Sequence, residues 1–143
     1  MTDGRVLALD LGEKRIGIAI SDPGGIIATP YDVIKHVSRK IDIALILQLA
    51  RENNVKTIVI GEARGENGEE TRQSRHAQIF MEALHEESQL AITLWDESYS
   101  TKTAQLTRAA MGVTRKNRRG HLDDLAATII LQSYLDAQRE LEN

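Results

Sequence analysis

Cysteine is absent from the 143-residue sequence. Its absence excludes disulfide bonds, thiolate metal sites, iron–sulfur clusters and cysteine nucleophiles. No apolar run approaches the ~18 residues that a membrane-spanning helix requires. The sequence also enters its first strand without the apolar core of a signal peptide. We therefore expect a soluble, cytoplasmic protein that does not act in a membrane.

Aromatic residues are scarce and scattered, at 3% of the chain. This scarcity argues against a platform on which single-stranded bases stack. The four histidines have no metal-ligand spacing, and no Gly-x-x-x-x-Gly-Lys phosphate loop is present. The net charge is −3, so any anionic partner must be bound by a local basic patch rather than by the whole surface.

The length predicts one domain spanning residues 1–143. Apolar and alternating runs predict strands at residues 6–10, 16–20, 26–34, 56–61 and 90–95. Helical spacing and capping residues predict helices at 38–53, 71–87, 101–111 and from 122 to about 141. Pro30 limits its strand to a sheet edge or a bulge. The order βββαβαβαα predicts an α/β fold, a five-stranded mixed sheet with helices on both faces.

Three acidic residues stand where predicted elements end or begin. Asp10 closes the first strand and precedes Gly12, so its side chain could reach a ligand without obstruction, although Asp-x-Gly is also a common turn. Asp96 or Glu97 would lie near Asp10 if the fifth strand pairs beside the first, although an acid there could instead cap the next helix.

Asp123 lies in the first turn of the last helix, where acids are favoured by the helix dipole alone. Apolar residues at 122, 125, 126 and 129 are expected to face the core, which places Asp123 at the edge of that stripe. Several converging carboxylates, with phosphate oxygens and water, are the ligands that Mg²⁺ or Mn²⁺ requires. The three acids together therefore predict a divalent metal site.

The stretch from residue 98 to residue 122 contains no acidic residue and many basic ones. These are Lys102, Arg108, Arg115, Lys116, Arg118 and Arg119, with His121 beside them. The predicted loop at 113–120 could be an ordinary solvated loop, but it directly precedes Asp123, and Lys and Arg bind phosphates without reading bases. The sequence therefore points to metal-dependent chemistry on a nucleic acid.

Three ordered motifs resemble those of the YqgF-type (RuvX-type) family, whose members are described as Holliday-junction resolvases and as pre-16S ribosomal RNA processing nucleases. The motifs are residues 10–22 (DLGEKRIGIAISD), residues 96–101 (DESYST) and residues 122–135 (LDDLAATIILQSYL). The resemblance spans nearly the whole chain. It implies an RNase H-like fold and phosphodiester hydrolysis assisted by two metal ions.

Carried over by motif, the resemblance assigns catalysis and metal binding to Asp10, Glu97 and Asp123. Asp10 would bridge two Mg²⁺ or Mn²⁺ ions, and the other two acids would each complete one coordination shell. The nucleic-acid backbone would be held by Lys14, Arg15, Arg115, Lys116, Arg118 and Arg119. Asp124 is a weaker candidate, because it falls on a position that is not acidic in the family.

Two residues depart from the family pattern. Ser98 replaces the usual Arg after Asp-Glu, which would remove a phosphate contact or a support for Glu97. Glu62 and Ala63 replace the usual Leu-Pro after Gly61, and Glu62 would add negative charge near a substrate groove. Both departures concern the strength of nucleic-acid binding rather than the fold.

The sequence leaves the substrate open. The family resemblance favours RNA, but a DNA four-way junction is an alternative, and a resolvase would be a two-fold dimer where an RNA processor can be a monomer. Residues 10–17 also resemble the phosphate-binding hairpin of the actin-like ATPases, although that superfamily uses two such domains. A catalytically silent nucleic-acid-binding module is the third alternative.

Overall fold

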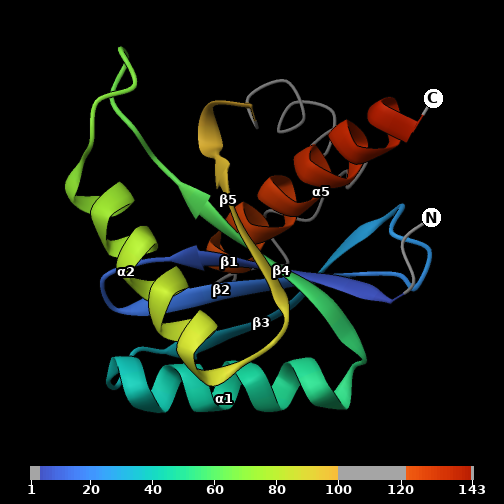
Figure 1. The fold of residues 1–143 in the computed structure, drawn as a ribbon, viewed down its shortest axis with the longest axis horizontal. Helices are drawn as coiled ribbons and strands as arrows, with labels where there is room; N and C mark the ends of the chain where they lie inside the picture. Colours follow the sequence, from blue (N-terminus) through green and yellow to red (C-terminus); the bar gives the residue numbers. More distant parts are fainter. Residues whose placement is uncertain (1–3, 100–121, 143) are drawn as a thin grey trace.

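The computed structural model describes residues 4–99 and 122–142, with the backbone alone at residues 99, 122–124 and 142 (Figure 1). The helix predicted at 101–111 and the basic loop predicted at 113–120 lie outside these residues. None of the described helices combines the length and the apolar content that crossing a membrane would need.

A five-stranded mixed sheet organises the fold, in the order β3-β2-β1-β4-β5. The first three strands, β1 (Arg5–Leu11), β2 (Arg15–Ser21) and β3 (Ala28–Lys35), form an antiparallel meander. The two later strands, β4 (Val55–Glu62) and β5 (Ala91–Asp96), run parallel to β1. The mixed sheet predicted from the sequence is confirmed.

The start of β3 differs from the prediction. Ile26 and Ile27 precede the strand because their amides donate to Asp22 Oδ1 at 2.7 and 2.8 Å, which holds them in the turn after β2. Pro30 lies in the edge strand, and the register shifts there, with Ile18 opposite Asp32 and Ala19 opposite Pro30. The predicted edge or bulge position of Pro30 is thus confirmed.

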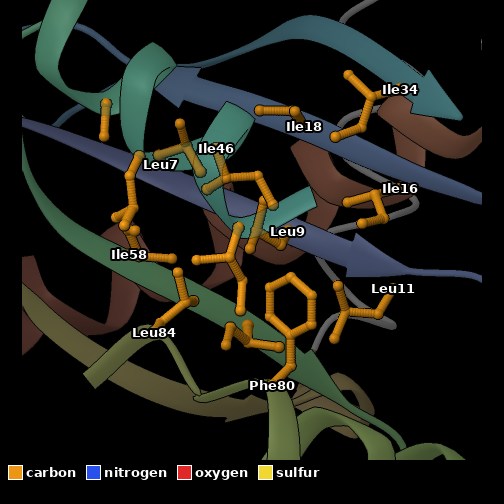
Figure 2. Close-up of a cluster of buried hydrophobic side chains, with 14 of the residues drawn as sticks. Leu7, Leu9, Leu11, Ile16, Ile18, Ile34, Ile46, Ile58, Phe80 and Leu84 are labelled. Atoms are coloured by element: carbon orange, nitrogen blue, oxygen red, sulfur yellow. The ribbon is translucent and has the colours of Figure 1, made fainter. Parts of the chain in front are cut away.

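One face of the sheet is covered by α1 (Arg39–Glu52) and α2 (Arg72–Glu87). Ser38 caps α1, and Thr71 caps α2 in a capping box with Ser74. Leu7, Leu9, Ile58, Phe80 and Leu84 pack together in the core between this face and the two helices (Figure 2). Strand alternation sends every second residue of β1 into this cluster.

The other face of the sheet is covered by α5 (Leu122–Glu142). Its sheet-facing residues are Ala127, Ile130, Leu131 and Leu135, which pack on Val6, Ala8, Ala19 and Val59. The predicted stripe is confirmed for Ile129, which is buried, but Leu125 and Ala126 are only half-buried. Residues 125–131 are almost all apolar, so their periodicity does not single out one face.

Candidate active site

The carboxyl ends of β1, β4 and β5 meet at one edge of the sheet, because the three strands are parallel. Leu9 pairs with Ile60, and Ile60 pairs with Leu94. One residue further along, Asp10 is level with Gly61, which pairs with Trp95. Ligands of α/β proteins gather at such strand ends, so this edge is the natural place for the predicted site.

Asp10 belongs to the α5 face of the sheet. Val6 and Ala8 contact α5, and strand alternation places Asp10 on the same side. Its neighbours across the sheet are both glycines, namely Gly17 in β2 and Gly61 in β4. At these two positions no Cβ flanks the half-buried Asp10 side chain.

Gly12 has a different function from the one expected from the sequence. Its amide donates to Arg15 O at 2.9 Å, and a Cβ at this position would lie 2.7 Å from the same oxygen. Gly12 therefore permits the tight turn between β1 and β2. The residues level with Asp10 on the adjoining strands are Gly17 and Gly61, which the sequence did not single out.

Glu97 follows β5 at the start of the short 3₁₀ helix η1 (Glu97–Tyr99). Its side chain lies across Gly61, because a Cβ on Gly61 would be 2.9 Å from Glu97 Oε1 and 3.4 Å from its Cγ. Since Gly61 is level with Asp10 in the sheet, Glu97 extends toward the strand that carries Asp10. The convergence of these two acids on one metal site stays a prediction.

Asp96 points elsewhere. It pairs in register with Glu62, and its Oδ1 accepts a hydrogen bond from the Ser98 amide at 2.9 Å. Asp96 therefore starts the 3₁₀ turn rather than joining Asp10. Of the two acids that the sequence left open at this position, the structure directs Glu97 toward the site.

The electrostatics of Glu97 favour a cation. Burial raises the pKa of Glu97 above its ordinary value of 4.5, and the charge of the neighbouring Asp96 raises it further. A half-buried carboxylate under these two effects is stabilised in its ionised form by a nearby positive charge, and a hard divalent ion prefers oxygen ligands. The residues present therefore fit a divalent metal.

Asp123 is the second residue of α5, and its side chain lies outside the described part of the structure. Asp123 precedes Ala127 by four residues and Ile130 by seven. These spacings place its backbone on the same side of the helix as the residues that face the sheet. Ile130 itself lies over Gly61, since its Cδ1 would be 2.6 Å from a Cβ there. Asp123 stays a predicted ligand, and so does Asp124 as the weaker candidate.

Among the side chains that the structure describes, no three acids or histidines come together as a metal site. The complete predicted set needs Asp123, whose side chain is not one of them. Asp10 and Glu97 are therefore the two predicted ligands whose side chains the structure describes.

Glu62, one departure from the family pattern, lies at the same edge but on the α2 face. It is buried, with Arg64 Nε 3.2 Å from its Oε1 and Gln78 Nε2 donating to its Oε2 at 3.1 Å. Its charge is paired within the protein. The negative charge that the sequence led us to expect near a substrate groove is thereby largely compensated.

The predicted backbone-binding residues are only partly described. Lys14 lies in the turn between β1 and β2, Arg15 begins β2, and both side chains are exposed at the edge that carries Asp10. The other four, Arg115, Lys116, Arg118 and Arg119, lie outside the described residues and remain predictions.

The fold is similar to that of Holliday-junction resolvases. The structure of T. thermophilus RuvC in complex with a Holliday junction substrate matches with a TM-score of 0.67 at 15% identity, covering 96% of each chain. This likeness, together with the acidic strand edge, defines an α/β protein with the RNase H-like resolvase fold.

The chain belongs to the RuvX family, whose model, described as "Holliday junction resolvase", matches residues 4–137. Relatives from Syntrophomonas wolfei subsp. wolfei and Roseiflexus sp. are both named "Putative pre-16S rRNA nuclease". The first is 38% identical over 132 residues, or 92% of this chain and 94% of the relative. The second is 38% identical over 136 residues, or 95% and 96%.

Proposed function

We propose that this protein is a metal-dependent endonuclease that hydrolyses phosphodiester bonds in structured nucleic acid and processes the 5′ end of pre-16S rRNA. The observation that carries the proposal is the position of Glu97 across Gly61, beside the strand that carries Asp10. Family membership and the names of the relatives support the nucleic-acid substrate.

Asp10, Glu97 and Asp123 would hold Mg²⁺ or Mn²⁺ at this edge. A divalent ion bound there would lower the pKa of the attacking water and stabilise the charge on the leaving oxygen. We infer that the positions of Asp10 and Glu97 are fixed, because Asp10 lies in a central strand and Glu97 lies across Gly61. A rigid site maintains the carboxylates in a fixed arrangement before the substrate binds.

Basic side chains around the acids would hold the nucleic-acid backbone. Lys14 and Arg15 are exposed on the same edge as Asp10, and the four basic residues between 115 and 119 directly precede α5. Contacts of this kind bind phosphates without sequence preference, so structure rather than sequence would select the cleavage site.

Resolution of a DNA four-way junction is the second candidate function. It is favoured by the description of the family model and by the RuvC-like fold. A resolvase makes paired cuts and would act as a two-fold homodimer, whereas the rRNA processor can act as a monomer. Cleavage of precursor rRNA and of a four-way DNA junction, assayed side by side, separates the two substrates.

The Asp10→Asn variant tests the nuclease itself. It keeps the shape of the side chain but removes its charge, so we expect the cleavage rate to fall by at least about 10²-fold. Circular dichroism should show an unchanged fold, and Mg²⁺ should raise the melting temperature of the wild type more than that of the variant. Undiminished cleavage by Asp10→Asn would contradict the assignment.

A further inference from the structure

A cavity of about 690 Å³ opens on the opposite face of the sheet from Asp10. Its floor includes Leu11, Ile16 and Phe80, which belong to the core beneath α1 and α2 (Figure 2). Its walls come from the turn between β1 and β2 and from the first turns of the two helices. Because Leu11 directly follows Asp10, the cavity adjoins the acidic edge.

Basic side chains dominate the polar lining of this cavity. They are Arg39 at the start of α1, Arg72 at the start of α2, His36 and His76. The acids in the lining are Glu13 and Asp42, and Asp42 is already engaged by His36 Nδ1 at 2.5 Å and the Val37 amide at 3.1 Å.

Neither arginine forms an ion pair with a carboxylate of the described residues. The ion pairs in residues 4–99 and 122–142 involve Arg64, Arg75, Arg139 and His36, and not Arg39 or Arg72. The pKa of His76 is lowered by burial first, and then by the positive charges of Arg39 and His36. The cavity therefore contains two guanidinium groups that are not held in ion pairs with described carboxylates.

This charge comes from side chains rather than from helix termini. The Ser38 hydroxyl accepts from the Ile41 amide, and the Thr71 hydroxyl accepts from the Ser74 amide. These capping side chains engage amides of the first helical turns. A ligand of the cavity would therefore be bound mainly by the guanidinium and imidazole groups.

We propose that this cavity binds a backbone phosphate of the nucleic-acid strand, beyond the phosphate that is cut. This proposal rests on the proposed nuclease function, because the strand would pass from Asp10 over the turn that begins at Gly12. Guanidinium groups bind phosphate oxygens in a bidentate manner, and a volume of about 690 Å³ lies within the range of small-molecule sites.

Gln73 links the cavity to the acidic edge. It lines the cavity, its Nε2 donates to Gly61 O at 3.2 Å, and its Oε1 accepts from the Ala63 amide at 2.6 Å. Gly61 is the residue over which Glu97 lies. Through Gln73, the wall of the cavity is hydrogen-bonded to the end of β4, over which Glu97 lies. This connection suits a single nucleic-acid strand that contacts both the cavity and the acidic edge.

Binding is measured in the Asp10→Asn background, so that cleavage does not obscure it. The probe is fluorescently labelled oligouridine, followed by anisotropy over a range of salt concentrations. We expect Arg39→Gln with Arg72→Gln to weaken binding by about tenfold or more. The slope of log affinity against log salt should become shallower by about 0.7 for each phosphate that the variant no longer neutralises.

Two control variants make the test specific. Arg75→Gln removes an exposed α2 arginine that pairs with Glu70 at 3.6 Å and does not line the cavity, so it should leave affinity and slope unchanged. Glu13→Gln removes negative charge from the lining and should tighten binding. Equal behaviour of the double variant and Arg75→Gln, with both proteins folded by circular dichroism, overturns the proposal.

Uridine monophosphate distinguishes a strand from a free nucleotide. The double variant could abolish binding of uridine monophosphate and leave oligouridine binding unchanged. That result would assign the cavity to a free nucleotide and overturn the strand proposal. Failure of the nuclease is distinguishable, because binding measured with EDTA in place of Mg²⁺ does not depend on cleavage. Weaker oligouridine binding by the double variant then supports the cavity even if Asp10→Asn does not alter cleavage.

Discussion

Glu97 lies across the α-carbon of Gly61, so closely that a Cβ on Gly61 would be 2.9 Å from Glu97 Oε1. The two residues come from neighbouring parallel strand ends, and Gly61 is level with Asp10. Glycine at position 61 therefore allows an acid from after β5 to extend toward an acid at the end of β1. The relationship makes Gly61 part of the candidate site although it has no side chain.

The first prediction concerns this close approach. Gly61→Ala should reduce the cleavage rate by at least about tenfold, because the methyl group displaces the Glu97 carboxylate. Alanine in a strand interior is intrinsically favoured over glycine by about 0.5–1 kcal/mol. A loss of stability would therefore reflect the collision of the new methyl group with its neighbours rather than a change in backbone preference. Cleavage assays and urea unfolding measure the two effects.

The new Cβ of Gly61→Ala would collide with both Glu97 and Ile130. Ile130→Val removes the second collision, because it deletes the Cδ1 atom that would lie 2.6 Å from the new Cβ. The Gly61→Ala/Ile130→Val variant should recover stability but not activity. Gly24→Ala, in the turn after β2, is the matched control and should leave cleavage unchanged. Full activity of Gly61→Ala would show that the position of Glu97 is not required.

The second prediction concerns the buried Asp42, which is 2% exposed at the first turn of α1. Its carboxylate engages His36 and the Val37 amide, and hydrogen bonds to charged groups contribute about 1.5–3 kcal/mol. Asp42→Ala should therefore lower the free energy of unfolding by about that amount in urea titrations. Asp32→Ala, at an exposed position of β3, should change it by less than about 0.5 kcal/mol.

The third prediction is a dependence of stability on pH through His76. Its pKa in the folded protein is below its ordinary value of 6.5, chiefly because of burial. Protonation therefore favours the unfolded chain, so the contribution of His76 to stability is complete above pH 6.5 and is lost as the pH falls through the lowered pKa.

His76→Gln should make stability less sensitive to acid, measured by urea unfolding above and below pH 6.5. His85→Gln, at an exposed position of the same helix, provides the comparison and should keep the sensitivity of the wild type. If His76→Gln lost stability on acidification as steeply as the wild type, another group would be responsible.

The sheet could be predicted from the sequence, and so could the edge of the sheet that carries Asp10. Short apolar runs defined the five strands, and the order of elements required a meander followed by parallel strands. Asp96 or Glu97 was expected near Asp10 if β5 paired beside β1, and that pairing is wrong, because β4 lies between the two strands. Both strands still end at the same edge, because they are parallel. These inferences depend on local patterns and on general rules of chain connection, which one sequence contains.

The directions of side chains could not be predicted in the same way. Asp96 and Glu97 are adjacent in sequence, and only the 3₁₀ turn after β5 separates their directions. The residues of α5 that face the sheet were only partly predicted, because an almost wholly apolar helical segment gives no rotational preference.

The sequence by itself thus determined the strand pattern, the mixed sheet and the candidate acids, because hydrophobic periodicity and motif order are properties of neighbouring residues. Only the tertiary structure decided that Gly17 and Gly61 flank Asp10, that Glu97 lies over Gly61, and that Arg39 and Arg72 share one cavity. These relationships depend on strand register and helix packing, which bring together residues that are distant along the chain.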